Sequence, residues 1–424
     1  AEAASGPESI YTAFSLHEVA LLRLQVGVGA GALPLAARAA AIRERRIGLS
    51  HPLTISSAIA QARALAAIGR TREAVAAFEE IDRRAVEALG ETSAVVGAVR
   101  TEFAKVALEA GDAERAYRLA KAALPGLEAR VRFGPAHASQ GDRGGLSAVA
   151  LRAIAAGGGR DPATAFAVMQ LMAQSEAAFA SIRTAARRST DDRELIDLAD
   201  QQRLLADRVA AAERESAAAY LAGDPVRIRA TGEAMRAARA ESLAVDAALS
   251  ARFPTYAALA GRYRVGLDAF IAGPAPLLAP DEALIQMVQE QDALYLLVAT
   301  RRGARFTRVD LPAAQAAALV RRIRVSLDIA EAATAQDLPA FDLDAAHALH
   351  RAVIAPMAEA LAGARVLLVA ADGPLASLPL GLLVERPGRG RDAFARYRAT
   401  RWLADRYGFV TLTTPAALAA ARQT

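Results

Sequence analysis

The chain has 424 residues, more than one ordinary hydrophobic core accommodates, so its length predicts two or three domains. Hydrophobic residues make up 54% of it, many of them alanine, and only 5% are aromatic, which favours packed helices over a β-sandwich. No apolar run reaches the roughly 18 residues of a membrane span, so we expect a soluble protein. The lack of cysteine excludes disulfides, thiolate metal ligands and a cysteine nucleophile within the chain.

The net charge of +5 and an isoelectric point near 9.8 raise the question of a nucleic-acid partner. Lys105 and Lys121 are the only lysines, and the arginines alternate with aspartate and glutamate. Such alternation is typical of salt-bridged helix surfaces, and aromatic residues interleaved as stacking platforms are missing. We therefore expect no nucleic-acid partner; an RNA-binding chain would instead show binding that weakens steeply with salt.

The first residues, from Ala1, lack a methionine. They fit either the mature end left by signal-peptide cleavage or a boundary of the sequence, so cytoplasmic and exported (periplasmic) locations both remain open.

The N-terminal third is periodic, with a repeat of about 42 residues that predicts a helical solenoid over residues 10–145. Three glycines stand at this interval, and so do three alanines that each follow five positions later: Gly27, Gly69 and Gly111, with Ala32, Ala74 and Ala116. Gly48 and Gly90 are separated by the same interval, and Gly134 follows slightly later than the next period would place it. Agreement in several registers makes a chance pattern a poor explanation.

One repeat unit shows why the period indicates paired helices. A helical pattern ends at Gly69, which can adopt the left-handed conformation that terminates a helix, and a second begins within three positions. Ala74 is small where two helices must approach, and Phe78 follows one turn later on the same face.

The loop at 48–54, GLSHPLT, resembles the Leu-Gly-x-x-His-Pro-x-Thr loop of the longer tetratricopeptide repeats in kinesin-light-chain-like arrays. This resemblance covers residues 10–145 and implies a protein or peptide partner in a concave groove. The alternative is an array that only supports the rest of the chain. The run at 27–32, GVGAGA, has no preceding strand, so we expect no dinucleotide cofactor there.

The middle of the chain, residues 146–260, reads as long helices. A break at 157–162, GGGRDP, lets Asp161 cap a helix with Pro162 at its first position. Alanine-, arginine- and glutamate-rich helical patterns follow, with a hairpin expected at 223–225, GDP.

From residue 261 the class changes to a partial α/β domain, 261–424. Strands are expected at 283–288, 293–299, 306–311, 366–370 and 409–412, and helices at 312–329, 344–361, 401–407 and from Pro415. The first three strands are linked as a β-meander, and 366–370 reads as a buried parallel strand. The fold class is therefore mainly α: a tetratricopeptide-type solenoid and long helices, followed by a partial caspase-like α/β domain.

The order of these segments resembles a CHAT domain, the caspase-like domain associated with tetratricopeptide repeats. The resemblance rests on FPTYAAL at 253–259, DEAL at 281–284, the meander around Tyr295, and ARVLLVAADGPLASLPLGLLV at 364–384. The last segment is similar to a strand followed by Pro-Asp-Gly-x-Leu-x-x-Leu-Pro-Phe-x-x-Leu. Ala371 and Leu380 replace the first proline and the phenylalanine, and TTPA at 413–416 lacks the serine of the family's Pro-Ser motif.

The family resembles clan CD cysteine peptidases, whose catalytic histidine and cysteine motifs follow the Pro-Ser region. This sequence ends at Thr424 before either motif, and none of its histidines (His17, His51, His137, His347 and His350) stands in a matching one. The resemblance therefore assigns no catalytic residue here, and we expect the chain alone not to be catalytic.

Two further groups of residues could carry chemistry. His347 and His350 are three apart on an expected helix, with Asp342 and Asp344 upstream, but a metal site needs a third convergent ligand, so we expect no metal. Asp372 follows the 366–370 strand at its carboxyl end, where α/β sheets place ligands. It is our candidate substrate-binding residue; the alternative is a turn residue that caps its own backbone.

Two functions remain open from the sequence. The first is the partner- or substrate-recognition and regulatory part of a tetratricopeptide–CHAT cysteine peptidase. The alternative is a non-catalytic interaction scaffold with a degenerate CHAT domain. Histidine and cysteine motifs encoded beyond Thr424 would favour the first, and a stop codon the second.

Overall fold

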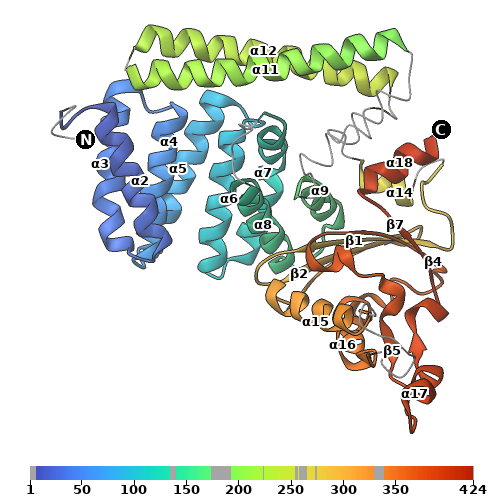
Figure 1. Ribbon diagram of the computed structural model, residues 1–424. Coiled ribbons are helices and arrows are strands. Elements are labelled where there is room, and N and C mark those ends of the chain that lie inside the picture. Colours follow the sequence, from blue (N-terminus) through green and yellow to red (C-terminus); the bar gives the residue numbers. More distant parts are fainter. Residues whose placement is uncertain are drawn as a thin grey trace. The chain divides into compact units, whose positions relative to one another are not determined.

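The computed structural model describes residues 6–133, 140–172, 192–222, 224–253, 256, 265–272, 275–328 and 339–423 (Figure 1). The chain forms two compact units, one of residues 1–157 with 184–257 and one of residues 158–183 with 258–424. The fold is mainly α, with a partial α/β arrangement in the C-terminal part, as the sequence predicts. The boundaries expected at 145/146 and 260/261 stay predictions.

The first unit begins with helix pairs at a constant interval (Figure 1). The first helices of the pairs each have 16 residues and begin at the same register of the repeat: α2 (Ile10–Gln25), α4 (Pro52–Ala67) and α6 (Ala94–Glu109). The second helices also begin at a common register: α3 (Gly29–Ile47), α5 (Thr71–Leu89) and α7 (Ala113–Phe133). Helix α8 (Gln140–Ala156) follows and packs on α6 and α7. The predicted period therefore corresponds to one pair of helices.

The turn inside each pair is a helix-terminating glycine in the left-handed region. Gly27, Gly69 and Gly111 have φ of 78°, 80° and 78°. In the second pair the Arg70 N–H donates to the Leu65 carbonyl over 2.9 Å, and the Gly69 N–H donates to the Ala66 carbonyl. This pair of hydrogen bonds satisfies the last carbonyls of a helix and needs a residue that tolerates positive φ. The same pattern recurs at Gly27 and Gly111.

The start of each first helix is capped by a side chain at the same register. Ser9, His51 and Ser93 are the N-cap residues of α2, α4 and α6, and each accepts a hydrogen bond from a backbone N–H in the first turn. In α4 the acceptor is Nδ1 of His51, 3.2 Å from the Leu53 nitrogen. The histidine of the 48–54 loop is thus a capping residue.

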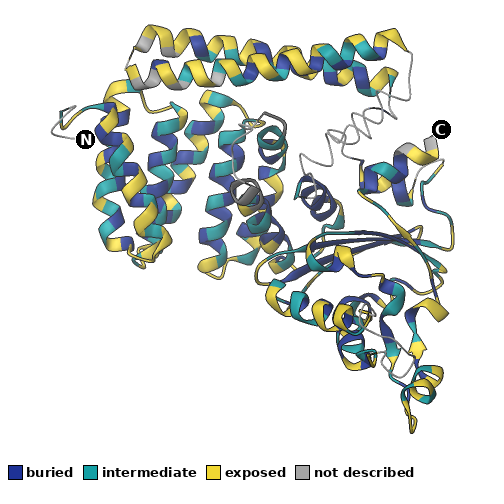
Figure 2. Cartoon of the chain, viewed as in Figure 1, coloured by how far each residue is buried: buried dark blue, intermediate teal, exposed yellow. Residues whose placement is uncertain are grey.

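Buried residues recur along the helices of the repeats (Figure 2), and they are mostly small, beside a few large ones. Ala32, Ala74 and Ala116 are fully buried, as expected where two helices approach closely. The rings of Phe78 and Phe103 stack at 5.2 Å between α5 and α6. The alternation of small and large side chains lets consecutive pairs share one core.

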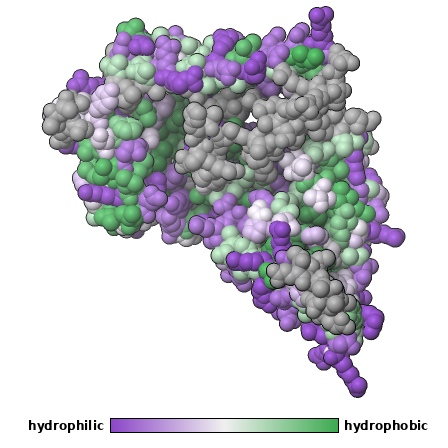
Figure 3. Space-filling model, viewed as in Figure 1, coloured by the Kyte–Doolittle hydropathy of each residue, from purple (hydrophilic) through white to green (hydrophobic). Residues whose placement is uncertain are grey.

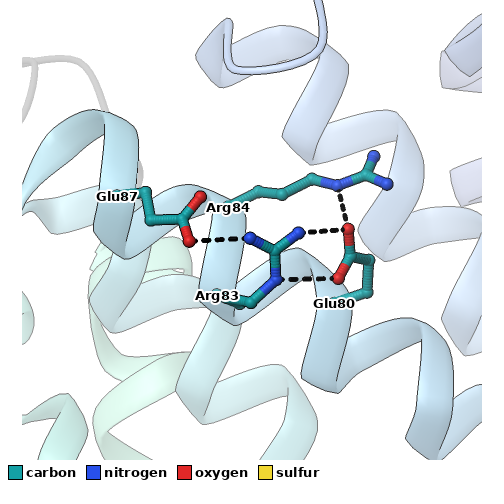
Figure 4. Close-up of polar contacts among 4 residues, drawn as sticks. All are labelled: Glu80, Arg83, Arg84 and Glu87. Atoms are coloured by element: carbon teal, nitrogen blue, oxygen red, sulfur yellow. Dashed lines mark hydrogen bonds and ion pairs between the residues drawn. The ribbon is translucent and has the colours of Figure 1, made fainter.

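The outer surface of α5 shows the charge pairing predicted from the alternating sequence (Figure 4). Arg83 bridges two carboxylates on either side of it, 2.7 Å from each of Glu80 and Glu87, and Arg84 also pairs with Glu80. These are exposed pairs within one helix, so solvent screens them and they contribute little to stability.

Two long helices complete the first unit: α11 (Arg193–Ala222) and α12 (Pro225–Arg252). Two contacts show that they run antiparallel: Gln202 donates to Asp246 over 2.5 Å, and Arg208, later in α11, pairs with Glu241, earlier in α12, at 2.6 Å. Asp224 caps α12 by accepting from the Val226 and Arg227 N–H groups, with Pro225 at the first position. The predicted hairpin of long helices is confirmed, although Gly223 lies outside the described residues.

The second unit is built on a mixed five-stranded sheet of order β3-β2-β1-β4-β7. Its strands are β1 (Glu282–Gln289), β2 (Leu294–Thr300), β3 (Gly303–Val309), β4 (Val366–Ala371) and β7 (Gly408–Thr411). β1, β2 and β3 form the predicted antiparallel meander, and β4 is parallel to both β1 and β7. A two-stranded sheet pairs β5 (Val384–Arg386) with β6 (Arg401–Trp402).

Helices cover both faces of the large sheet. Alternate residues of the strands, among them Ile285, Leu296 and Leu367, pack against α15 (Ala313–Val325) and α16 (Leu343–Val353). Helices α9 (Pro162–Met172) and α14 (Leu267–Ile271) also pack on the meander strands. The rings of Phe166 and Phe270 meet edge to face, with their centroids 5.5 Å apart. The meander strands are therefore covered on both sides, and the four middle residues of β4 are also buried, in agreement with its continuous apolar run. The remaining helices are α17 (Ala393–Ala399) and α18 (Pro415–Gln423), and short 3-10 turns occur at Ala355–Met357, Gly373–Ser377, Leu380–Leu382 and Leu403–Asp405.

Two sequence predictions in this unit were wrong in detail. Residues 401–407 were predicted as a helix; they form β6 and a 3-10 turn, because Arg401 and Trp402 pair with β5 and the Leu403 N–H donates to the Leu383 carbonyl. The helix predicted at 344–361 ends at Val353, because Pro356 cannot continue it.

Several expected features lie outside the described residues. They are the third inter-repeat loop at 134–137 with His137, and much of the FPTYAAL segment at 253–259.

Candidate functional site

The first helix of the repeats and the turn after it carry a cluster of exposed apolar side chains, which we call the α2 row. It consists of six residues that are 41–74% exposed: Tyr11, Phe14, Val19, Leu22, Val26 and Val28. They are six of the fourteen large hydrophobic residues that are exposed anywhere in the described part of the chain, so the exposure is concentrated here. Figure 3 shows hydrophobic surface (green) where α2 and α3 lie.

The equivalent positions of later repeats explain what this row is. Leu22 is 60% exposed, whereas Ala64 and Val106, at the same register one and two periods later, are 0% and 3% exposed. Ala64 is buried in a cluster with Ala20, Ala32 and other alanines of the preceding pair. Leu22 therefore occupies a position at which α4 and α6 are buried against neighbouring helices.

A buried polar cluster lies directly behind this row. The fully buried Arg43 of α3 donates to the Leu53 carbonyl over 2.8 Å and to the Ser57 hydroxyl over 2.7 Å. His17 of α2 lies 3.4 Å from the same hydroxyl. Burial, and then the nearby Arg43 charge, lower the pKa of His17 and of His51 to about 4. Both imidazoles are thus neutral at neutral pH, and the cluster joins three helices.

Asp372 lies at the carboxyl end of β4, as predicted. One of its carboxylate oxygens accepts a hydrogen bond from the Gln289 N–H at 2.6 Å, which joins the ends of β1 and β4. Burial raises the pKa of Asp372 to about 6. The residue is half-buried at the end of the strand, and its carboxylate holds the hydrogen bond to Gln289. Its role as a substrate-binding residue stays a prediction.

The histidine pair of α16 does not assemble a metal site with the nearby acids. The His347 and His350 rings stack at 6.2 Å, and Nδ1 of His347 lies 2.9 Å from the Val384 carbonyl oxygen, to which it donates. Asp342 instead caps α16 and pairs with Arg322. Among the described residues no group of three or more metal-ligating side chains converges.

The glycine run at 27–32 serves helix packing. Gly27 terminates α2, and a Cβ on Gly29 would lie 2.7 Å from the Cβ of Ala67, so α3 approaches α4 closely there. Helices, not a strand, flank the run.

A cavity that the sequence patterns did not predict lies beside α17. It has a volume of about 860 Å³ and is lined by Arg386, Arg389 and Arg396, among others. The signal was present in the sequence as the run RPGRGRDAFARYRATR at 386–401, whose arginines lack the alternating acids found elsewhere.

Across the described ranges, no helix is long and apolar enough to cross a lipid bilayer.

Two solved crystal structures resemble this chain. Both are of a putative kinesin light chain from Podosopora anserina with nearly identical TPR-like repeats, and the second is of a single-substitution variant. Each is 22% identical to it with a TM-score of 0.30, covering 54% of this chain and 95% or 92% of its own length. No protein-family model matches the chain, and no curated protein matches it either. The tetratricopeptide-like character of the repeats rests on their own helix pairs, period and glycine turns.

Proposed function

We propose that this chain recognises a protein partner through its helical repeats. The observation that carries the proposal is the α2 row, because large apolar patches on a protein surface mark interaction sites. The sequence resemblance adds a concave groove along the array as the path of the partner segment. The row at the first helix would be its apolar anchor.

The chemistry of the α2 row indicates the kind of partner. In α4 and α6 the equivalent face packs against helices, with small and aliphatic side chains interdigitating. A partner for α2 would therefore be a helix with apolar side chains at positions i, i+3, i+4 and i+7. The charged surface of α5 supplies no comparable apolar contact.

A defined probe tests this proposal. It is a fluorescein-labelled, helix-forming peptide of about 20 residues with leucines at those positions, compared with a scrambled peptide of the same composition. We expect anisotropy to show binding of the first peptide and an affinity about tenfold lower for Leu22→Glu. Leu204→Glu, at a leucine 56% exposed on α11, is the matched control and should bind as the wild type does. Equal losses in both variants, or no preference for the helical pattern, would contradict the proposal.

For the second unit we propose the front half of a caspase-like domain, in a regulatory or substrate-recognition role. Support comes from the sequence resemblance at 364–384 and from the parallel strands β1, β4 and β7 that continue the meander. Because the chain has no cysteine, it should not hydrolyse caspase-type fluorogenic peptides, with or without a thiol alkylator. Turnover of these peptides by the purified chain that persists after thiol alkylation would overturn this reading.

The alternative is a non-catalytic scaffold in which this unit only supports assembly, and the absent cysteine favours it equally. Asp372 separates the two. If it lines a substrate pocket, its carboxylate would pair with a basic side chain. Peptides carrying one arginine should then bind the wild type more tightly than Asp372→Asn, and peptides with glutamine at that place should not discriminate. Identical binding of both peptide sets would favour the scaffold.

A further inference from the structure

The net positive charge of the whole chain is concentrated in one short segment. Residues 386–401 contain six arginines and one aspartate, a net charge of +5. This equals the formal net charge of the entire chain, so the remainder is neutral overall. The segment forms the end of β5, a glycine-containing loop, α17 and the start of β6. Figure 3 shows the hydrophilic surface (purple) at this end of the second unit.

Three of these arginines line one cavity. Arg386, Arg389 and Arg396 border a space of about 860 Å³. Ligand pockets in proteins have volumes of roughly 300–1,000 Å³, so the cavity is large enough for a small molecule.

The backbone that carries these arginines is fixed by close contacts. A Cβ on Gly388 would lie 2.1 Å from the Arg396 carbonyl oxygen, and a Cβ on Gly390 would lie 2.7 Å from that of Ala395. Only glycine allows the loop to lie so close to α17. The Gly388 N–H donates to the hydroxyl of the buried Thr400 over 2.9 Å, which itself donates to the Arg396 carbonyl. A ligand would therefore find the loop already ordered, which lowers the entropy cost of binding.

Five of the six arginines in this segment have no acidic partner within the described residues. No ion pair involves Arg386, Arg389, Arg391, Arg396 or Arg398 there. The two acids nearest in sequence are engaged elsewhere: Glu385 pairs with Arg401 and Arg406, and Asp392 caps α17. This contrasts with α5, where Glu80 alone meets two arginines.

We propose that this cavity binds a phosphate-bearing ligand. Because three arginine residues line one space, an anion bound there would lie close to several positive charges. A phosphate carries up to two negative charges and several acceptor oxygens on one centre, whereas a carboxylate carries one charge and two oxygens. Arginine rather than lysine also suits bidentate contact with phosphate oxygens. Two sources offer this chemistry: a free di- or triphosphate and the backbone of a single-stranded nucleic acid.

The test is a titration of the full chain with inorganic pyrophosphate as the probe. Isothermal titration calorimetry measures the binding. We expect saturable binding, and a loss of about tenfold or more in affinity for Arg389→Gln and for Arg396→Gln. Arg398→Gln is the matched control, because it removes the same charge from the same helix at a residue that does not line the cavity. Its affinity should change by less than about twofold, since an exposed charge contributes little at a distance.

Competition then separates the sources. A labelled oligonucleotide whose binding is displaced by pyrophosphate and weakens steeply between about 50 and 200 mM salt identifies the nucleic-acid backbone. Pyrophosphate binding without oligonucleotide binding identifies a free phosphate. The proposal is overturned if pyrophosphate does not bind, if Arg398→Gln weakens binding as much as Arg389→Gln, or if polyglutamate binds and pyrophosphate fails to displace it. Circular dichroism of each variant confirms that the fold is retained.

Discussion

At the scale of single residues, Asp372 makes the stability of the second unit depend on pH. Burial raises the pKa of its carboxyl from 3.8 to about 6 in the folded protein. Between those values the folded chain holds a proton that the unfolded chain has released. The stabilisation is therefore complete below the unfolded value and is lost as the pH rises through about 6. We expect the free energy of unfolding to fall by roughly 2–3 kcal/mol from pH 4 to pH 7 through this group.

Asp372→Asn isolates that contribution, because the amide oxygen can still accept from the Gln289 N–H without carrying a charge. Urea unfolding followed by the fluorescence of Trp402, the single tryptophan, reports on the second unit. The difference between wild type and variant should grow from pH 4 to pH 7 in favour of the variant. Parallel pH curves would show that the carboxyl titrates normally.

Gln286 offers a second residue-level prediction. It lies in the centre of β1 at 1% exposure, and neither its amide nitrogen nor its amide oxygen has a hydrogen-bond partner among the described residues. A buried amide without partners costs free energy, so Gln286→Met should raise the free energy of unfolding by about 1 kcal/mol.

The matched control is Gln170, whose amide is also buried but donates to the Val265 carbonyl at 3.0 Å. Gln170→Met should destabilise the same unit by about 1–3 kcal/mol. Chemical unfolding of the two variants should therefore give opposite signs. Loss of stability in both would mean that Gln286 is satisfied in the folded chain.

Residue roles that depend on local backbone conformation could be predicted from the sequence. The left-handed turn at Gly69 follows from a glycine placed after a helical pattern, and the repeat register extended it to Gly27 and Gly111. The same register could have included Gly6, which lies one period before Gly48 and has φ of 85°. The exposure of Leu22 could not be predicted, because it depends on which helix pair is next to it and not on its own neighbours.

At the scale of elements, helices α6 and α7 approach each other very closely where they cross at two glycines. A Cβ on Gly97 would lie 2.6 Å from the carbonyl carbon of Gly126, which is backbone and cannot move aside alone. Alanine is intrinsically better than glycine in a helix by about 1 kcal/mol. We expect Gly97→Ala nevertheless to destabilise the first unit by about 2 kcal/mol, because the helices must separate.

Gly145 of α8 is the matched control, since a Cβ there would meet nothing within 4 Å. Gly145→Ala should stabilise the protein by about 0.5–1 kcal/mol. Thermal unfolding followed by helical circular dichroism measures both substitutions. If the two variants shift the midpoint in the same direction, packing does not determine the α6–α7 crossing.

The elements that sequence reasoning missed are those fixed by contacts distant in sequence. Residues 401–407 were predicted as a helix, and in the structure Leu403 and Tyr407, four positions apart, are both buried, as they would be on one face of a helix. The segment is a strand and a 3-10 turn because β5, which lies before α17 in the chain, supplies a pairing edge at Val384 and Arg386. The meander was predictable because its strands pair with their immediate neighbours along the chain.

At the scale of the whole molecule, averages hide where charge and apolar surface are placed. The balanced acids and bases correctly predicted paired arginines on α5, but the same average concealed the segment at 386–401, most of whose arginines have no acidic partner among the described residues. Likewise the composition predicts many packed alanines, whereas the large exposed side chains gather on α2. Both features lie on surfaces, where position along the chain says little about neighbours in space.

The α2 row should limit the solubility of the whole chain. The row places several large apolar side chains in solvent, and exposed apolar patches of this kind promote association between molecules. The double variant Val19→Lys with Leu22→Glu places two charges on that face without touching a buried partner, as both side chains are more than 40% exposed. Its free energy of unfolding should stay within about 0.5 kcal/mol of the wild type. Light scattering should show less association at high concentration, and the dye ANS should bind less. Leu204→Glu on α11 is the control and should leave light scattering and ANS binding unchanged. A double variant that unfolds, or that scatters as the wild type does, would show that these side chains are covered in the folded protein.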